Sequence, residues 1–557
     1  MSSSPHNTTA DQIGWRPSAN PWMITISVML ATFMVVLDTS VANVALPHIA
    51  GNLSATTDES TWVLTSYLVS NAIMLPATGW IARRMGRKRL LMTSIAVFTC
   101  ASLLCGVAVN MAMLIIARIL QGVGGGGIQP LAQSILLESF PPEDHGMAMA
   151  AYGMGIVVAP VIGPTLGGWI TDSYSWRWIF YINLPVGSLA LFMVQMFVED
   201  PPYIREAFRG AIDYLGFGLM AVWLGTLQLV LDKGQEADWF GATWIRLIAV
   251  VSLIALIGFI FREFSHREPI VQLRILGDRN FSVGAVITCL YGFILYGSTA
   301  LLPLFLQTLL GYPALDSGLA VSPRGIGAVL STMLVGKLVK YFDSRVLLAC
   351  GFGILGYSTL LLSHVNLGIS MVSIALPSLL NGFGSGFIFV PLTVMTLGRL
   401  RKEDIGNAAG IYNLMRNIGG SVGIATVTTF LVRGSQVHQS YLAANVTNRN
   451  PMMVAMLHGL QAKLCSGGFD AYTAHRKAMA TLYEMLQEQA SLLAYVDNFR
   501  LLGLLSLLCV PLAMFFRCVQ QRKDNHPNFA TESQPEMRQK CKRDQMDREA
   551  IRSAEIT

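Results

Sequence analysis

The chain has 557 residues, of which 53% are hydrophobic and only 13% are charged, and its mean hydropathy is +0.51. Soluble domains carry about 25% charged residues, so this composition excludes a soluble globular protein and indicates a polytopic membrane protein. The net charge of +6 is therefore attributed to loops beside a membrane, and we expect no nucleic-acid partner.

Apolar windows long enough to span a bilayer occur along the whole chain. We predict fourteen spans, at 23–46, 62–82, 90–109, 112–138, 148–170, 178–198, 213–231, 245–262, 281–302, 318–339, 346–363, 370–397, 408–431 and 499–518. Because this number is even, both termini are expected on one side of the membrane. The sequence thus predicts an all-α integral membrane protein with fourteen transmembrane helices.

The distribution of Lys and Arg predicts which side that is. Loops on the side of the N-terminus are rich in both, beginning with Arg83, Arg84, Arg87, Lys88 and Arg89. Short loops on the opposite side carry little beyond Arg177 and Lys233. Since Lys and Arg accumulate in cytoplasmic loops, both termini are expected in the cytoplasm.

Three segments of the chain occur twice. Gly79 to Leu90 resembles Gly336 to Leu347 at an offset of 336 − 79 = 257 residues. The run Gln121-Gly122-x-Gly124-x-Gly126 resembles the run from Asn381 to Gly386, and Glu143-Asp144-x-Gly146 resembles the run from Glu403 to Gly406, both offset by 381 − 121 = 260. Matches at nearly one offset predict two parallel six-span halves with two linker spans between them.

These patterns divide the chain into segments. The expected divisions are a cytoplasmic N-terminus at 1–22, a six-helix bundle at 23–198, linker helices at 199–280, a second bundle at 281–520 and a disordered cytoplasmic tail at 521–557. The second bundle contains a long outer loop at 432–498. Residues 471–496 within this loop favour one amphipathic helix, with Leu482, Met485, Ala490 and Leu493 near one stripe.

Asp38 lies about half-way along the first predicted span. A carboxylate at that depth is costly unless it is paired, solvated or protonated, so it is a candidate proton carrier. A structural hydrogen-bonding role toward Thr39, Asn43 or a neighbouring helix is the alternative. Arg118, in the fourth span, must face a polar interior and is expected to control release of the proton from a nearby acid.

The fifth span contains an uncharged, glycine-rich segment, AYGMGIVVAPVIGPTLGG, at 151–168. Its glycines and prolines would break a soluble helix, but they are tolerated in a membrane helix, where small residues allow close approach of neighbours. We expect this helix to pack across the interface between the halves. A simple tight packing face is the alternative interpretation.

Polar residues recur in the later spans. Arg416 and Asn413 lie in the thirteenth span, and Arg416 is expected to pair with an acid or to contact substrate. Candidate cavity residues, chosen by span position, are Tyr67, Gln129, Tyr291, Phe293, Tyr296, Gln307, Tyr412 and Asn413. Glu138, Asp213, Asp232 and Arg324 lie near span ends and are expected to be solvated or interfacial.

Several motifs together resemble those of the major facilitator superfamily, in the fourteen-span drug:proton antiporter family and its EmrB-type branch. Gly155, Gly163, Pro164, Gly167 and Gly168 resemble the antiporter signature of the fifth span, and the run from Leu37 to Pro47, with Asp38 and Asn43, resembles the first-span motif. Arg118, Gln121, Gly122 and Gly124 resemble the fourth-span motif, and WRWIFYINLPVG at 176–187 is typical of this branch. The loop with Arg83, Arg84 and Gly86 resembles the cytoplasmic motif between spans 2 and 3, although the wider family has Asp where Arg83 stands.

This resemblance implies the major facilitator fold and a proton-coupled antiporter that exports amphipathic hydrophobic compounds (drugs, biocides and fatty acids among them) across the bacterial inner membrane. It also implies a periplasmic adaptor and an outer-membrane channel as partners. A transporter of one metabolite or siderophore on the same fold, and a receptor that has lost transport, are the alternatives. No metal-ligand spacing and no phosphate-loop signature occur in the sequence, so the proton gradient is the expected source of energy and no cofactor is expected.

Overall fold

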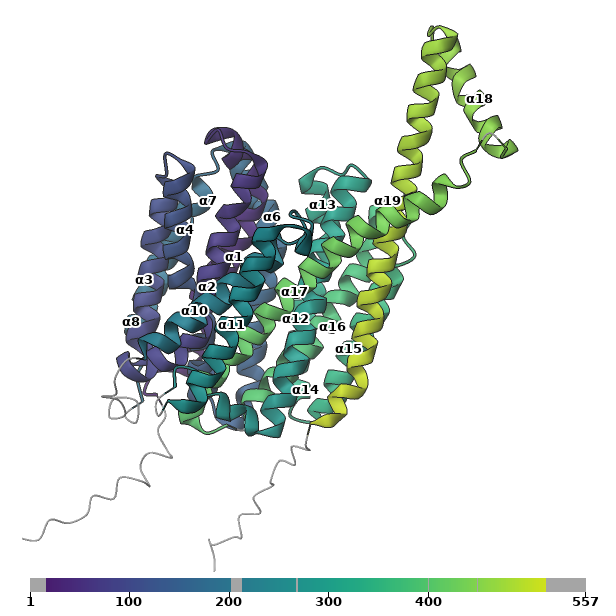
Figure 1. Cartoon of the computed structure of the whole chain (residues 1–557). Helices are drawn as coiled ribbons and strands as arrows, with labels where there is room; N and C mark the ends of the chain where they lie inside the picture. The colour runs from purple at the N-terminus through teal and green to yellow at the C-terminus, as the bar shows by residue number, and fades with distance from the viewer. Residues whose placement is uncertain (1–16, 202–212, 267–268, 399, 448, 517–557) are drawn as a thin grey trace, which may run out of the picture. The chain divides into compact units, whose positions relative to one another are not determined.

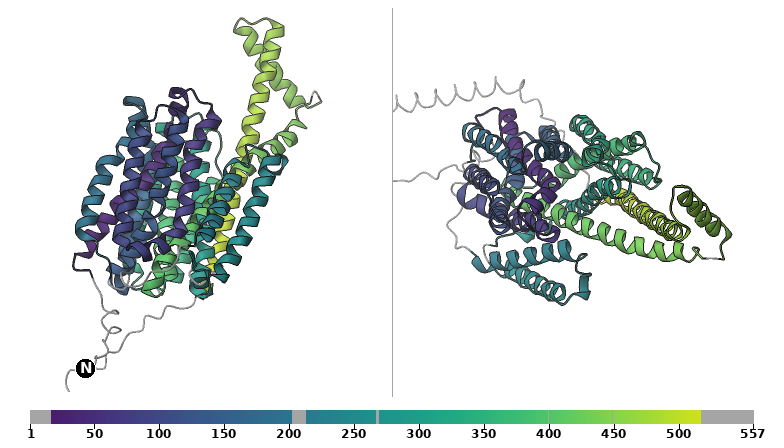
Figure 2. Two further views of the ribbon diagram at one scale, coloured as in Figure 1. Left: turned by 60° about the vertical axis from the view of Figure 1, so that its left-hand side comes forward. Right: turned by 90° about the horizontal axis from the view of Figure 1, so that it is seen from above.

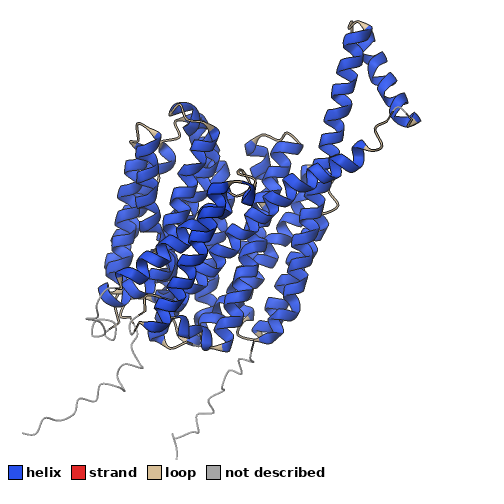
Figure 3. Cartoon of the chain, viewed as in Figure 1, coloured by secondary structure: helices blue, strands red, loops and turns tan. Residues whose placement is uncertain are grey.

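The computed structural model describes residues 17–201, 213–266, 269–398, 400–447 and 449–516, and within these ranges the chain forms helices and no strand (Figure 3). The predicted tail at 521–557 and most of the predicted N-terminal segment lie outside the described residues. Within 17–516 the helices form two halves joined by a linker pair (Figure 1). The part of the chain that the structure describes is therefore an all-helical bundle, as the composition predicts.

The first half contains the helices that precede the linker. They are α1 (Pro21–Asn52), α2 (Thr57–Met85), α3 (Arg87–Gly106), α4 (Met111–Gly126), α5 (Ile128–Ser139), α6 (His145–Ser173), α7 (Trp178–Tyr181) and α8 (Asn183–Phe197). The linker helices are α10 (Tyr214–Lys233) and α11 (Thr243–Ser265), which pack side by side at the edge of the bundle (Figure 2).

The second half contains the helices that follow the linker. They are α12 (Arg279–Leu304), α13 (Ala314–Val321), α14 (Pro323–Leu338), α15 (Ser344–Leu362), α16 (Met371–Leu397), α17 (Lys402–Ala443), α18 (Pro451–Ser466) and α19 (Ala471–Leu512). A π-helix at Phe305–Leu309 continues α12, and short 3-10 helices lie at Pro142–Asp144 (η1) and Leu273–Gly277 (η3). The N-terminal end of α1 and the C-terminal end of α19 lie at the same end of the bundle, which we call the basal end (Figure 1). The opposite end is the distal end.

Twelve helical segments of the described chain are long and apolar enough to cross a membrane. α2 and α17 are not among them, because their sequences are less apolar, but both run through the bundle and pack against each other. With these two, fourteen helical segments of the described chain are long enough to cross a membrane, which is the number that the sequence predicts. These two less apolar helices pack against each other at the interface between the halves, where a protein neighbour replaces lipid.

The internal repeat reappears in how glycines pack. A Cβ on Gly122 of α4 would meet Tyr67 O of α2 at 2.5 Å, and a Cβ on Gly382 of α16 would meet Arg324 O of α14 at 1.8 Å. Gly124 and Gly384 fit in the same way against α3 and α15. Each half therefore has a glycine-rich fourth helix that packs closely between its second and third helices, at positions related by the offset of 260.

The halves are in close contact at the basal end. A Cβ on Gly79 of α2 would lie 2.6 Å from Cα of Asn407 in α17, and a Cβ on Gly336 of α14 would lie 2.7 Å from Cβ of Ala150 in α6. Beside these crossings Lys340 Nζ donates to Asp144 Oδ1 at 2.7 Å, which raises the pKa of the Lys340 ammonium. The structure is thus a basal-closed conformation.

A helical hairpin replaces the long outer loop expected at 432–498. α17 and α19 have 42 residues each, or about 63 Å, which is twice what a bilayer core of about 30 Å requires. Both project beyond the distal end, and α18 folds back along α19 (Figures 1 and 2). Residues 471–496 are helical as predicted, but the expected stripe is wrong in part. Leu482 and Ala490 are buried, whereas Met485 and Leu493 are exposed; Ala474 and Ala478 complete the face that packs.

Candidate functional site

The periodicity of α1 and α4 brings Asp38 and Arg118 together. The buried face of α4 contains Leu114, Ala117, Arg118 and Gln121, which recur at three- and four-residue spacing and therefore share one side of the helix. Asp38 lies on the buried stripe of α1. The glycines that follow Gln121 let α4 approach its neighbours closely, so that a short carboxylate and a long guanidinium meet inside the first half.

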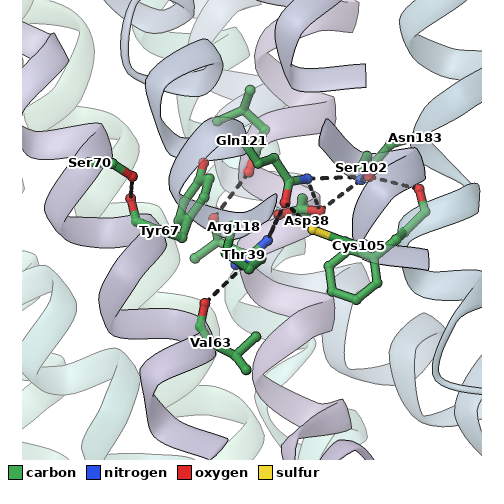
Figure 4. A network of polar contacts seen from close by, with 12 residues as sticks. Asp38, Thr39, Val63, Tyr67, Ser70, Ser102, Cys105, Arg118, Gln121 and Asn183 are labelled. Atoms are coloured by element: carbon green, nitrogen blue, oxygen red, sulfur yellow. Dashed lines mark hydrogen bonds and ion pairs between the residues drawn. The ribbon is translucent and has the colours of Figure 1, made fainter. Parts of the chain in front are cut away.

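Asp38 and Arg118 form a buried ion pair at the centre of a polar cluster (Figure 4). Arg118 Nη1 donates to Asp38 Oδ2 at 2.6 Å, and Gln121 Nε2 donates to Asp38 Oδ1 at 2.9 Å. Asn183 Nδ2 donates to the same Oδ1 at 2.7 Å and to Ser102 Oγ at 3.0 Å. We call Asp38, Arg118, Gln121, Asn183 and Ser102 the ion-pair cluster; its five residues come from α1, α3, α4 and α8.

The remaining contacts of Arg118 fix its orientation. Its Nε donates to Val63 O of α2 at 3.0 Å, and its Nη1 also donates to Gln121 Oε1 at 2.7 Å. The guanidinium lies over the Tyr67 ring, 4.4 Å from its centroid. Arg118 is 0% exposed and Asp38 is 2% exposed. A charge this deeply buried is stable only while its partner is charged, so the protonation state of Asp38 and the position of Arg118 depend on each other.

Sequence reasoning missed two members of the cluster. Asn183 lies within the WRWIFYINLPVG run, so the sequence identified the motif but not the hydrogen bond of Asn183 to Asp38. Ser102 lies in an apolar stretch of α3 with no pattern to distinguish it. Asn43, the motif residue that the alternative interpretation offered as a hydrogen-bond partner of Asp38, is exposed on α1.

The glycine helix α6 packs on α1 beside the cluster. A Cβ on Gly163 would lie 2.5 Å from Cβ of Ser40, and a Cβ on Gly167 would lie 3.0 Å from Cγ1 of Val41. The expectation that this helix packs across the interface between the halves is confirmed, because α6 also contacts α14 and α16. Those contacts are made by other residues of the same helix, among them Gly146, Ala150 and Gly153, whereas Gly163 and Gly167 face α1. Prolines at 160 and 164 remain inside the helix.

The signature positions of α6 differ in how closely they are packed. Gly155 has one neighbour, the methyl group of Met29 at 3.4 Å, and Gly168 has nothing within 4 Å. Only Gly163 and Gly167 of the signature therefore require the absence of a side chain for contact with α1. Both lie next to residues that follow Asp38 within one helical turn.

A second polar cluster joins the two halves. Asn413 Nδ2 of α17 donates to Gln133 Oε1 of α5 at 2.7 Å, and Arg416 Nη2 donates to Gln129 Oε1 and, at 2.7 Å, to Asn413 Oδ1. We call Gln129, Gln133, Asn413 and Arg416 the interface cluster. Arg416 is 5% exposed, and among the described residues no carboxylate pairs with it. Of the two expected roles of Arg416, pairing with an acid is therefore wrong within the described chain.

The expected cavity residues do not form one wall. Gln129 and Asn413 belong to the interface cluster, but Tyr67 lies in the first half against Arg118. Two others are buried inside the second half, where the Tyr291 hydroxyl donates to Ser385 O at 3.4 Å and the Tyr412 hydroxyl is 3.0 Å from Thr393 Oγ1.

Three of the expected cavity residues lie on α12 or on the π-helix that continues it. Phe293 packs on Gly423, Tyr296 packs on Gly420 and is 40% exposed, and Gln307 donates to Ser317 Oγ at 3.3 Å toward the distal end. Tyr296 and the buried Tyr152, a residue outside the predicted set, lie near Arg416. Span position alone could not separate these environments, because it ignores which face of a helix a residue occupies.

The basal loop between α2 and α3 contains the expected arginine-rich motif. Gly86 has a φ of +88° and a Cβ there would lie 2.5 Å from Asp200 Oδ2, so the turn requires glycine. The Arg84 guanidinium lies over the Trp80 ring at 5.8 Å. The expected role of Arg83 in conformational change stays a prediction.

Charged residues near the span ends are more buried than expected. Glu138 pairs with Arg87, both nearly inaccessible to solvent, and Arg87 Nη2 also donates to Lys402 O across the interface at 3.3 Å. Asp213 pairs with Arg262 at 3.0 Å. Arg324 is 7% exposed and donates to Ser298 Oγ at 3.2 Å. Of the two predicted environments, the solvated one is therefore wrong for Glu138, Asp213 and Arg324, and the interfacial one stays a prediction.

Comparison with known proteins places this geometry in a family. Residues 28–424 match the family model described as Major Facilitator Superfamily. The chain is 40% identical over 438 residues to the multidrug export protein EmrB of Haemophilus influenzae. This alignment covers 78% of this chain and 85% of that protein. It is also 40% identical over 448 residues to the fatty acid resistance protein FarB of Neisseria gonorrhoeae, over 80% of this chain and 87% of that protein.

A solved structure supports the fold. The crystal structure of the human organic anion transporter MFSD10 (TETRAN) matches with a TM-score of 0.54, over 87% of this chain and 99% of that chain. At 13% identity this likeness concerns the fold alone. Among the described residues, no group of three or more His, Cys, Asp or Glu side chains is arranged to hold a metal ion.

Proposed function

Since the chain belongs to the major facilitator superfamily and to its EmrB-type branch, we propose that it is a proton-coupled antiporter that exports amphipathic hydrophobic compounds across the bacterial inner membrane. The observation that carries this proposal is the Asp38–Arg118 ion pair, which is buried in a transmembrane half and lies next to the α1–α6 packing. An intramembrane carboxylate held in this way is a natural site for a transported proton.

The proton acts on the ion pair. In the basal-closed conformation three side chains donate hydrogen bonds to the Asp38 carboxylate. A proton arriving at Asp38 removes the charge that Arg118 requires, and a buried arginine without its partner is unstable. The first half therefore rearranges around α1 and α4 until Arg118 regains solvent or another acceptor.

The rearrangement reaches the interface through α6. Ser40 and Val41 follow Asp38 on α1 and pack on Gly163 and Gly167, while the basal part of α6 packs on α14 of the second half. A shift of α1 relative to α6 therefore changes the contact between the halves. This connection supports alternating access by rocking of one half against the other.

The interface cluster supports the substrate assignment. Arg416 and Gln129 lie between the halves with tyrosines close by, so the surface combines aromatic area, amide groups and one buried cation. Such a surface suits amphipathic compounds that carry hydrogen-bond acceptors or a negative charge. Fatty acids are included in the proposed range because the relative FarB is named a fatty acid resistance protein.

The orientation follows from charge. The basal end carries the arginine-rich loop at 83–89, and Lys and Arg accumulate on the cytoplasmic side of membrane proteins. Both termini are therefore cytoplasmic in our proposal, and the hairpin of α17, α18 and α19 projects into the periplasm. A hairpin this long exceeds what membrane passage requires, and it exposes Tyr441, Met452 and Tyr472. We propose that it docks a periplasmic adaptor, which connects the transporter to an outer-membrane channel.

The experiment is proton-coupled flux in proteoliposomes. The purified protein is reconstituted with an imposed pH gradient, and a panel of dyes, biocides, fatty acids and single metabolites is tested for substrate-dependent proton movement. The proposal predicts proton movement with several chemically different amphipaths. Coupled movement with one metabolite or siderophore only would establish the narrow-specificity alternative, and no coupled movement with any compound would contradict transport by this mechanism.

A further inference from the structure

A cavity of about 660 Å³ lies between the linker helices and the α2–α17 pair, and none of the residues of the two polar clusters lines it. α10 and α11 form one wall, η3 closes the basal side, and α2 and α17 form the other wall. The lining residues include Pro76, Met220, Trp223, Phe259, Arg274 and Leu414. The volume lies within the range of about 300–1,000 Å³ that is typical of ligand sites.

The walls of this cavity, which we call the linker cavity, are fixed by specific contacts. The rings of Trp223 and Phe259 are stacked with centroids 5.7 Å apart. At the basal ends of α10 and α11, Arg262 donates two hydrogen bonds to Asp213 Oδ1 at 3.1 and 3.0 Å. The segment that precedes η3 is held to α11 by a hydrogen bond, which Val271 N donates to Glu263 Oε1 at 3.3 Å. The linker cavity is therefore a formed site.

Its lining is apolar except at one end. Ile260, Phe264 and Leu276 line the cavity and are 40%, 60% and 39% exposed, so in a membrane they face lipid chains. Arg274 lines the cavity at its basal end and is exposed. Among the described residues no carboxylate pairs with Arg274. From the basal end of α2 at Met85 up to Pro76 the helical rise is roughly 14 Å, so the apolar part extends well into the bilayer.

We propose that the linker cavity binds one acyl chain of an anionic phospholipid from the basal leaflet, with the phosphate of its headgroup on Arg274. The apolar walls suit the chain, the exposed edge between α11 and η3 admits it from the bilayer, and an arginine at headgroup depth attracts an anionic head. Because Pro76 of α2 and Leu414 of α17 both line the cavity, the bound lipid contacts both halves and stabilises the basal-closed conformation. This inference does not depend on the proposed transport activity.

Trp223 provides a direct probe. The full-length protein is reconstituted in vesicles that contain either phosphatidylglycerol or phosphatidylethanolamine with brominated acyl chains, at equal mole fractions. Bromine quenches nearby tryptophan, and the contribution of Trp223 is obtained as the difference between the parent and Trp223→Phe. We expect this contribution to be quenched more strongly by the brominated phosphatidylglycerol. Arg274→Gln should reduce the preference roughly fivefold, the factor that corresponds to about 1 kcal/mol for one basic residue near an anionic surface.

Arg279→Gln is the matched control, because it removes an exposed basal arginine that does not line the cavity. It should leave the preference of Trp223 unchanged. Equal quenching by the two brominated lipids, or a preference that survives Arg274→Gln, would contradict the proposal. Selective quenching by a brominated free fatty acid alone, with none by the phospholipid, would also overturn it and would identify the linker cavity as an entry site for a substrate.

Discussion

At the scale of single residues, the protein holds its charges by pairing them inside the membrane. Asp38 accepts hydrogen bonds from three side chains, and Arg118 is further held by Val63 O. The sequence predicted that both residues carry function, since charges at mid-span are rare without a role. It could not predict that they pair, because α1 and α4 are not adjacent in sequence, and it gave no sign of Ser102.

The ion pair predicts strong energetic coupling between its members. Arg118→Met should destabilise the folded protein by about 3–5 kcal/mol, because it leaves Asp38 charged and unpaired in a dry site. Adding Asp38→Asn should restore part of this loss, so the double variant should be more stable than the sum of the single effects predicts, by about 0.5–3 kcal/mol. Thermal unfolding of the four proteins in one detergent measures the cycle. Strictly additive losses would show that the two side chains do not interact.

At the scale of helices, glycines decide which elements approach each other. The sequence predicted that the glycine motif of the fourth helix recurs in both halves and that Gly163 lies at a close-packed contact, and the structure confirms both. The sequence did not predict which helix packs on Gly163, because small residues lie on every face of α6 and each face could therefore pack closely on a neighbour. The tertiary arrangement assigns one face to α1 and another to the second half.

Gly163→Leu tests the α1–α6 contact. The new side chain would have to displace Ser40, so we expect folded protein with exchange that is lost or uncoupled from protons. Gly168→Leu is the matched control, since it lies on the same helix with nothing within 4 Å, and it should transport like the parent. Substrate-driven proton flux in proteoliposomes compares the three proteins. Unchanged coupling in Gly163→Leu would show that this contact does not transmit the movement.

Gly79→Leu tests basal closure. A side chain at this position would meet the backbone of Asn407, so the variant should favour conformations in which α2 and α17 separate. In a cysteine-free background, Gln133→Cys should then react faster with a maleimide, because the interface cluster becomes accessible. Gly353→Leu, with nothing within 4 Å of its position, is the control. Equal labelling rates in the two variants would contradict the role of this crossing.

At the scale of the whole molecule, the long helices α17 and α19 extend the second half well beyond the bilayer. The sequence predicted the length of the outer segment and the helicity of its second part, but it ended the thirteenth span at residue 431, where the helix continues to Ala443. Hydropathy marks where a helix leaves lipid and carries no information on where it ends. Contacts such as the pair of His438 Nε2 with Asp497 Oδ2 at 2.7 Å keep the two helices together.

Replacing residues 440–490 with a short Gly/Ser linker tests the docking role of the hairpin. The change removes α18 and the projecting parts of its neighbours but leaves the bundle intact. We expect lost resistance in cells and lost capture of the adaptor, with proton-coupled transport retained in proteoliposomes. Transport that fails in proteoliposomes would instead identify the hairpin as a lid on its own transporter, and undiminished capture of the adaptor would show that docking occurs elsewhere.

The central claim is that protons drive export through Asp38, and the direct measurement is export by Asp38→Asn under an imposed pH gradient. This variant keeps the shape of the side chain and removes its charge. We predict that it still binds substrate, which establishes that it is folded, but that pH-driven transport collapses, while Asp172→Asn, which alters an exposed carboxylate on α6, transports like the parent. Normal pH-driven transport by Asp38→Asn would contradict the account.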